Sequence, residues 1–357
     1  MPGTPLGVFY TPALIFAFIL GINIGSFLNV VIWRLPRGGS LTTPTWSYCP
    51  NCEHQLSAMD LFPVFSFLAL GAKCRYCKKP ISWRYPGIEL LTGILFLGVA
   101  WRFGCSWETP FYCIATAIWV SVFFIDLEHF VIPDGLNILL VIVGIAHNVV
   151  AIATGEKLQK ILFFGHYTPA SIVGLFLYAS IIYGIGLLSY MYLVGLGAGR
   201  GVFRSGWTYV KENVMDWVYL CVYYLGTIIP PLRRFVDPPE PLVGATQEEI
   251  EEDEEAGGMG GGDGKLAAGI GATLYPQMAL LSLFLSLIVG VAYGIGMNVR
   301  NIRKFGTRTP IPFGPAMVAG AYLALLFGPQ IIAWYVTNFL TFPGSSFSTT
   351  GPGGGGQ

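Results

Sequence analysis

Two aspartates lie far apart in the sequence, and each stands where a long apolar segment meets polar residues. Asp126 ends the apolar run before "LEHFVIPD", and Asp263 follows glycines 260–262 and precedes another apolar run. Two carboxyl groups held close together can share one proton, so that one activates water while the other donates a hydrogen bond to a peptide carbonyl. The pair therefore predicts aspartic protease chemistry at a membrane surface, with glycines that let an extended peptide approach the backbone.

The expected helix directions suggest how the two aspartates divide this work. Asp263 opens a helix, whose positive dipole end favours a carboxylate, whereas Asp126 closes one, whose negative end favours the protonated acid. We hypothesise that Asp263 is the base and Asp126 the acid, although the proton belongs to the pair. Asp134 follows a proline and is explained by the dipole of the next helix alone. Glu128 and His129 are expected in a solvated loop.

Four cysteines form two CxxC motifs, "CPNC" and "CRYC", with 21 residues between them. Two such turns suit one tetrahedral zinc ion, and four sulfur ligands with no open position indicate a structural site. The alternative is two disulfides, which a cytoplasmic loop would disfavour because thiols stay reduced there. The predicted ligands are Cys49, Cys52, Cys74 and Cys77. Buried free thiols are expected for Cys105, Cys113 and Cys221.

Composition places these groups in a membrane protein. Of 357 residues, 54% are hydrophobic and 11% are charged, and the mean hydropathy is +0.61. Soluble domains carry about 25% charged residues. We predict an all-α polytopic membrane protein with about eight transmembrane helices and a small zinc-binding loop domain. The apolar segments are 8–33, read as a retained first span without a cleavable signal, then 86–102, 108–126, 135–154, 170–197, 264–275, 278–297 and 313–340.

Basic residues orient these spans. Lysines and arginines concentrate in loops 34–85 and 298–312, which the positive-inside rule places in the cytoplasm. Eight spans put both loops and both aspartates on that side, with the N-terminus outside. Residues 207–229 contain charged positions, so an interfacial or re-entrant helix is expected there, and a ninth span is the alternative.

The chain then divides into six segments. The first span (1–33) precedes the tetracysteine domain (34–85), and spans two to five (86–197) carry the first aspartate. An insertion with an acidic linker (198–262) precedes the last spans (263–342) and a disordered tail (343–357).

Several motifs in order resemble those of the bacterial type IV prepilin peptidases, also called prepilin leader peptidase/N-methyltransferases. They are "GSFLNVVIWRLP" (25–36), the two CxxC pairs, "ISWRYPGIELLTG" (81–93), "DLEHFVIPD" (126–134), "GMGGGDGKL" (258–266) and "PFGPAMVAG" (312–320). Together they cover most of the chain. The chain departs from the family at Gly264, where valine is usual, and over residues 200–253, which are longer than the usual connection.

The resemblance implies both an activity and its partners. Such enzymes, in the bacterial inner membrane, cut the basic leader of prepilins or of type II secretion pseudopilins after a glycine. They then methylate the new N-terminus with S-adenosylmethionine. Asp126 and Asp263 match the catalytic aspartates, with Gly260, Gly262, Lys265 and Asp134 supporting the site, and the tetracysteine loop matches the domain linked to methylation and zinc. Membrane lipid is expected as a further partner, and nucleic acid is not.

The methyl-transfer site has no Gly-rich fingerprint in this sequence. By position, the candidates are Asn29, Arg34, Arg84 and Glu89, at the mouths of the first two spans. For each of them an interfacial anchor is the simpler interpretation. Likewise, the acidic run 248–255 is either a solvated linker or an electrostatic guide for basic leaders.

Three other functions remain open from the residues. A proton-coupled transporter with a zinc-braced gate uses paired acids, but it predicts them near the membrane midplane. A presenilin-like intramembrane protease shares the glycine–aspartate motif but leaves the cysteines unexplained. A catalytically idle assembly protein is the third, and the presence of both aspartates argues against it.

Overall fold

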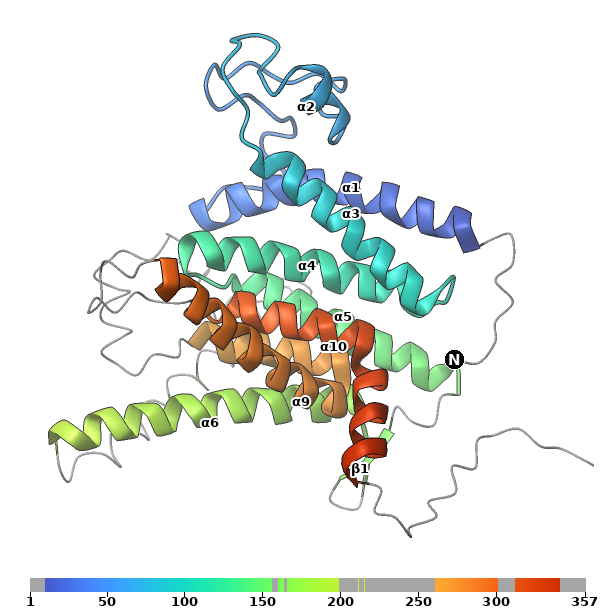
Figure 1. Ribbon diagram of the computed structural model, residues 1–357, viewed down its shortest axis with the longest axis vertical. Helices are drawn as coiled ribbons and strands as arrows, with labels where there is room; N and C mark the ends of the chain where they lie inside the picture. The colour runs from blue at the N-terminus through green and yellow to red at the C-terminus, as the bar shows by residue number, and fades with distance from the viewer. Residues whose placement is uncertain are drawn as a thin grey trace, which may run out of the picture.

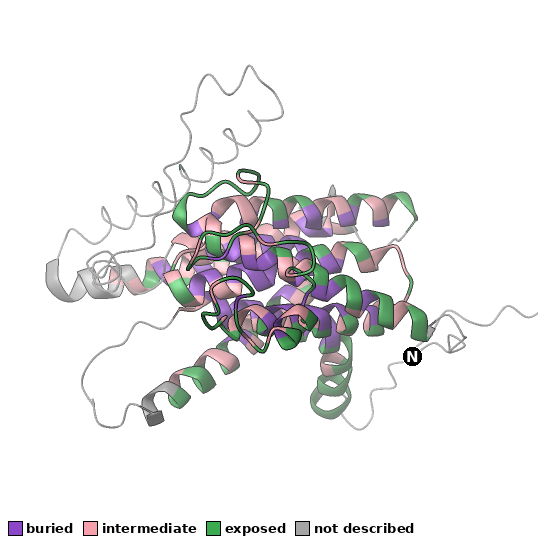
Figure 2. Cartoon of the chain, turned by 90° about the horizontal axis from the view of Figure 1, so that it is seen from above, coloured by how far each residue is buried: buried purple, intermediate pink, exposed green. Residues whose placement is uncertain are grey.

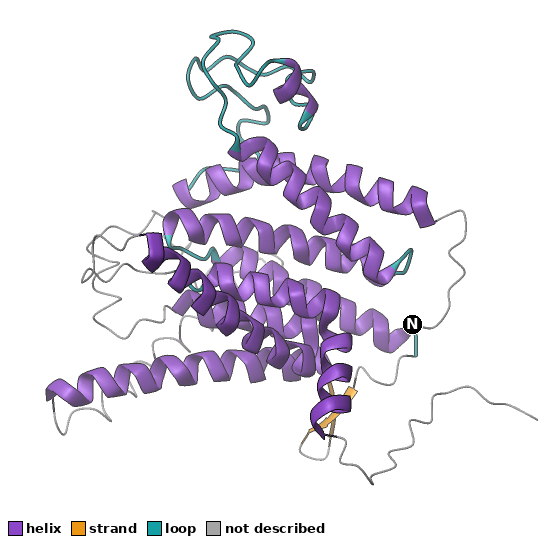
Figure 3. Ribbon diagram, in the orientation of Figure 1, coloured by secondary structure: helices purple, strands orange, loops and turns teal. Residues whose placement is uncertain are grey.

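The computed structural model describes residues 10–155, 160–163, 166–198, 211, 215, 261–300 and 312–340, which form a bundle of long helices and a loop domain with one short helix (Figure 1, Figure 3). The elements are α1 (Tyr10–Arg34), η1 (Leu35–Arg37), α2 (Phe65–Ala69), α3 (Arg84–Phe103), α4 (Glu108–His129), α5 (Asp134–Ala153), β1 (Lys160–Phe163), β2 (His166–Pro169), α6 (Ala170–Ala198), α9 (Gly261–Arg300), α10 (Gly314–Tyr335) and η6 (Val336–Leu340). Apart from residues 211 and 215, the predicted helix 207–229 lies outside the described residues. So do the acidic run, Gly260, Cys221 and the tail.

Helix α9 is a helical hairpin rather than one rod. Tyr275 has a non-helical backbone (φ 62°, ψ 170°) and precedes Pro276, which cannot supply a helical N–H. A hydrogen bond of 2.5 Å joins the Tyr275 hydroxyl to Nδ1 of His147 on α5 and braces this reversal. The first arm therefore covers residues 261–274 and the second residues 276–300.

Contacts with neighbouring helices establish the direction of each arm. Along the first arm, Gly262 lies on Ile132 and Ala272 lies on Gly144, so this arm runs parallel to α5. Along the second arm, Met278 and Gly290 lie on residues 328 and 316, so α10 runs antiparallel to it. Both ends of α9 consequently lie at the same end of the bundle (Figure 1).

Seven described helices are long and apolar enough to cross a membrane, and α9 counts among them as a single span. Because α9 reverses at Tyr275, its two arms run in opposite directions, and the long helical segments number eight when the arms are counted separately. The predicted fold class, an all-α polytopic protein with about eight spans, is confirmed. The predicted segments 264–275 and 278–297 are the two arms of α9. The β1–β2 hairpin, in which Lys160 pairs with Pro169, was not predicted.

The core lies between these helices, where buried residues gather in the middle of the bundle (Figure 2), and the first arm of α9 is its most completely buried part. Leu266, Ala267, Ala268 and Ile270 of this arm are fully buried. The backbones of Gly174 on α6 and Gly271 approach within contact distance, which residues with a Cβ would prevent. This arm is thus enclosed by protein on all sides.

One end of the bundle collects the groups that the sequence singled out. We call it the aspartate end, because α4 ends there and α9 begins there. Helix α1 ends there at Arg34, α3 begins at Arg84, and the second arm of α9 ends at Arg300. Both basic loops therefore attach to the end of the bundle that carries Asp126 and Asp263.

Candidate functional site

The two aspartates lie on helix ends that meet around Ile132, in the loop between α4 and α5. Asp126 is in the last turn of α4 and is 5% exposed, and Asp263 is in the first turn of α9 and is partly buried. A Cβ placed on Gly262 would lie 3.2 Å from Cβ of Ile132. A Cβ on Gly314, the first residue of α10, would meet both Ile132 and Oδ2 of Asp126. Among the described residues Oδ2 of Asp126 has no hydrogen-bond partner.

Helix α4 is longer than predicted. It continues through the last turn to His129, so Glu128 and His129 are helical and not part of a loop. The reason is that Phe130 adopts a left-handed conformation (φ 54°) and donates a backbone hydrogen bond to Asp126, which ends the helix only there. Glu128 forms an ion pair of 2.8 Å with Arg84 at the start of α3.

An ion pair connects the predicted supporting residues. Lys265 Nζ lies 3.0 Å from Oδ1 of Asp134, so it joins the first turn of α9 to the first turn of α5. Asp134 therefore does more than complement its own helix dipole. Gly262 was predicted to allow a peptide to approach, and in the structure its close neighbour is Ile132.

Tyr183 on α6 covers the turn that carries Asp263. Its ring occupies the position that a Cβ at Gly264 would take, and its hydroxyl donates a hydrogen bond of 3.3 Å to the carbonyl of Gly261. The sequence analysis missed Tyr183. The only signal in the sequence was the glycine at position 264, where the resembled family usually has valine. The structure explains that departure, because the missing side chain makes room for the tyrosine ring.

The four cysteines of the loop converge on one point. Their Sγ atoms all lie within 4.8 Å of one another, and those of Cys49 and Cys77 are 3.9 Å apart. A tetrahedral zinc ion with bonds of about 2.3 Å requires sulfurs about 3.8 Å apart. This donor set can therefore hold one zinc ion. Cys105 is exposed and Cys113 is buried, so only the second matches its prediction.

Hydrogen bonding favours the thiolate form of one of the four cysteines, Cys74. Backbone N–H groups of Cys77 and Tyr76 lower the pKa of Cys74 to about 7. For Cys52, a backbone hydrogen bond from His54 acts in the same direction. Desolvation and the sulfurs of Cys49 and Cys77 nevertheless raise its pKa to about 11. A bound cation would relieve this crowding of thiolates.

The two CxxC turns repeat the same backbone pattern 25 residues apart. In each, the first cysteine N–H bonds a carbonyl five residues on, from Cys49 to His54 and from Cys74 to Lys79. Each turn also has a positive φ one residue after its second cysteine, 56° at Glu53 and 59° at Lys78. Paired turns with the same conformation present their sulfurs in the same way, which suits a symmetric four-sulfur site.

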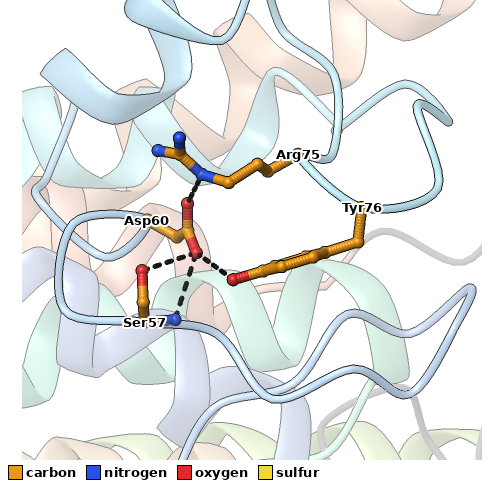
Figure 4. A network of polar contacts seen from close by, with 4 residues as sticks. All are labelled: Ser57, Asp60, Arg75 and Tyr76. Carbon is orange, nitrogen blue, oxygen red and sulfur yellow. Dashed lines mark hydrogen bonds and ion pairs between the residues drawn. The ribbon is translucent and has the colours of Figure 1, made fainter.

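Asp60 ties the two halves of the loop together (Figure 4). Its carboxylate accepts hydrogen bonds from Arg75 Nε at 2.6 Å, Tyr76 at 3.0 Å and the Ser57 hydroxyl at 2.8 Å. Burial alone would raise the pKa of Asp60, but these bonds outweigh it and lower the pKa from 3.8 to about 2. The stabilisation is complete above about pH 4, is lost as the pH falls towards 2, and is fully present at neutral pH.

A cavity of about 380 Å³ separates this loop from α1 and α3. Three of the four methyl-transfer candidates line it, namely Asn29, Arg34 and Glu89. Each also holds the backbone of the loop or of α3: Asn29 donates to Tyr85 O, Arg34 donates to Pro44 O at 2.8 Å, and Glu89 Oε2 accepts from Val64 N at 2.7 Å. Arg84 does not line the cavity. Its partner is Glu128, so the structure separates it from the other three.

The fold and these sites define a polytopic helical membrane protein with an acid pair and a tetracysteine loop at one end. Residues 19–103 match the model of the bacterial peptidase A24 N-terminal domain, and residues 113–295 match that of the type IV leader peptidase family. The chain belongs to the type IV leader peptidase family.

Several curated relatives match the chain in sequence over nearly their whole length. A prepilin leader peptidase/N-methyltransferase of Aeromonas hydrophila is 29% identical over 90% of this chain and 93% of its own. The protein of that name from Stutzerimonas stutzeri is 30% identical over 90% and 92%, and that from Bacillus subtilis is 28% identical over 89% and 96%. No solved structure matches the chain at a significant level.

The fit between Gly264 and Tyr183 predicts a compensating pair of substitutions. Gly264→Val should displace the Tyr183 ring and shift the turn that carries Asp263, lowering the peptidase rate by up to about 10²-fold. Adding Tyr183→Leu should restore part of that rate by vacating the space. The measurement is kcat and KM in detergent beside the melting temperature.

Gly184→Val is the matched control. Gly184 lies on α6 next to Tyr183, and a side chain there would meet only open space. A fully active Gly264→Val protein would contradict the role of Tyr183. So would a double variant that regains thermal stability but no activity.

The tetracysteine site predicts that the protein binds zinc only when all four sulfur ligands are present. Protein with Cys74→Ser should contain no stoichiometric zinc by elemental analysis, because three thiolates and a hydroxyl bind it far more weakly. Asp60→Asn should keep zinc but release it faster to a chelator, because the halves of the loop are less firmly joined. Cys105→Ser, outside the cluster, is the control and should keep both properties. Full zinc content in the Cys74→Ser protein would refute the assigned ligands.

Proposed function

We propose that this protein is a membrane aspartic endopeptidase that removes the basic leader of prepilins or pseudopilins and then methylates the new N-terminus. The observation that carries the proposal is the meeting of the Asp126 and Asp263 helix ends around Ile132 at one end of the bundle. Family membership and the names of the relatives support the same activity. In this proposal the aspartate end faces the cytoplasm of a bacterial inner membrane, as the basic residues at that end favour.

Cleavage then follows from the two acids. Asp263, at the positive end of the α9 dipole, is the carboxylate that takes a proton from the attacking water. Asp126, in the last turn of α4, donates a hydrogen bond to the scissile carbonyl and its proton to the departing amine. The ion pair between Lys265 and Asp134 keeps the starts of α9 and α5 in register. Tyr183 fixes the turn of Asp263 from the other side.

The position of the acids also separates this function from transport. A proton path would place titratable groups near the middle of the spans. Asp126 lies three residues before His129, the last residue of α4, and Asp263 lies in the first turn of α9. This arrangement supports a reaction at the membrane surface.

Methyl transfer is assigned to the cavity beside the tetracysteine loop. Its 380 Å³ lies within the range of about 300–1,000 Å³ typical of small-molecule sites. Trp33, Tyr48 and Tyr85 supply aromatic surface for a nucleobase, and the carboxylate of Glu89 and the guanidinium of Arg34 supply opposite charges for an amino acid moiety. S-adenosylmethionine would supply the methyl group there. The zinc ion would have a structural role in shaping the loop.

The acid pair is tested by replacing each aspartate separately. Asp126→Asn and Asp263→Asn should each lower prepilin cleavage by about 10²-fold or more, because each removes one of the two proton-transfer groups. The assay is gel-shift cleavage in detergent, with the melting temperature as a check on folding. Asp60→Asn, in the loop, serves as the control and should cleave normally. Retained cleavage in either folded variant would refute the dyad.

The cavity is tested by Glu89→Gln, which keeps an oxygen to accept the Val64 hydrogen bond but removes the charge. Cleavage should be unchanged, whereas methylation of the cut product should fall by roughly 10-fold or more, because the charged partner for the amino group of the methyl donor is lost. Labelled methyl incorporation and cleavage are measured in the same sample. Glu108→Gln, at the other end of the bundle, is the charge-matched control. Normal methylation by the Glu89→Gln protein would remove Glu89 from the reaction.

A further inference from the structure

The loop domain places an apolar segment beside the membrane helices rather than beyond their ends. Glu89 lies five residues after Arg84 on α3, which corresponds to about 7.5 Å along the helix axis. Its Oε2 accepts a hydrogen bond from the backbone N–H of Val64, the residue just before α2. Helix α2 is therefore held at the depth of the second turn of α3. Figure 1 shows the loop domain alongside α1 and α3.

A second contact holds α2 beside the start of α3. The ring of Phe67 on α2 packs edge-on against Trp83, with 4.8 Å between ring centres. Trp83 immediately precedes α3 and is 70% exposed. Exposed tryptophans next to a span are typical of the membrane–water interface. Phe67 faces the protein, so the opposite side of α2 is turned away from it.

The exposed residues of α2 and of the turn before it include large apolar side chains. Phe62 is 59% exposed, Phe65 and Leu68 are each 60% exposed, and Met59 is 77% exposed. Trp83 is expected at the membrane–water interface, so the medium around the second turn of α3 is expected to be the boundary between lipid headgroups and acyl chains. Leu90 and Ile94 on α3 are also exposed apolar residues. Interfacial helices bury their apolar faces about 5–10 Å into this boundary, which agrees with the depth of Glu89.

We infer that residues 59–68 form a lipid anchor, in which Met59, Phe62, Phe65 and Leu68 insert into the membrane leaflet at the aspartate end. The anchor adjoins the cavity, because Ser66, Phe67 and Leu70 line it. The segment that forms one wall of the cavity thus also contacts lipid. Glu89 lines the cavity and joins it to the anchor through the hydrogen bond from Val64. The anchor itself requires only the membrane-spanning fold, whereas its effect on the cavity rests on the proposed methyl transfer.

Photo-cross-linking tests the anchor directly. The full-length protein with p-benzoylphenylalanine in place of Phe65 is reconstituted into vesicles of phosphatidylethanolamine and phosphatidylglycerol and irradiated. We expect a phospholipid adduct by mass spectrometry. The same label at Gln55, an exposed polar residue of the first CxxC turn, should give little or none. Equal adducts at both positions, no lipid adduct at Phe65, or adducts with another protein chain instead would overturn the anchor.

A second measurement tests the effect on the cavity. In vesicles, the protein with Phe62→Ser and Phe65→Ser should cleave prepilin at the normal rate but methylate the cut product several-fold more slowly. Unchanged methylation would overturn the coupling while leaving the cross-link result standing. Absence of methylation in the unsubstituted protein would refute the proposed methyl transfer instead, so the two failures are distinguishable.

Discussion

The packing around Ile132 is the constraint on which the rest of the site depends. Gly262 on α9 and Gly314 on α10 both lie against this side chain, and Gly314 also touches Asp126. A Cβ at either glycine would overlap a neighbour or press upon it, so the close meeting of three helix starts with the end of α4 requires residues without side chains. The reversal at Tyr275 brings the second arm of α9 back towards the same end, where Gly290 lies beside Phe313 and Ala316 at the start of α10.

Much of the architecture could be predicted because a membrane restricts both the length of apolar segments and the placement of basic loops. Apolar length gave the spans, and the Lys and Arg distribution gave the common end of loops 34–85 and 298–312. Two CxxC pairs predicted a four-sulfur cluster, and the structure gathers those sulfurs within 4.8 Å. The aspartates could be placed at span ends because charge ends an apolar run, although the catalytic role of each stays a prediction.

What sequence reasoning missed depends on contacts between distant residues. Nothing near Tyr183 indicates that its ring fills the space above Gly264, 81 residues later. The extension of α4 to His129 is decided by the left-handed Phe130, a conformation that a phenylalanine rarely adopts. The cavity could not be located either, since it forms only when the loop folds back and Val64 bonds Glu89 inside α3. Arg84 was grouped with its neighbours by position, yet its side chain turns to Glu128.

The unequal arms of α9 have a consequence for how the protein is made. The first arm, residues 261–274, has a length of about 21 Å, which is too short to cross a hydrocarbon core of about 30 Å. Its glycines and alanines also offer little free energy of partitioning into lipid. This segment cannot enter the bilayer alone during synthesis, and it must be delivered together with the longer, more apolar arm that follows. The placement of Asp263 is therefore completed only after residues 276–300 have left the ribosome.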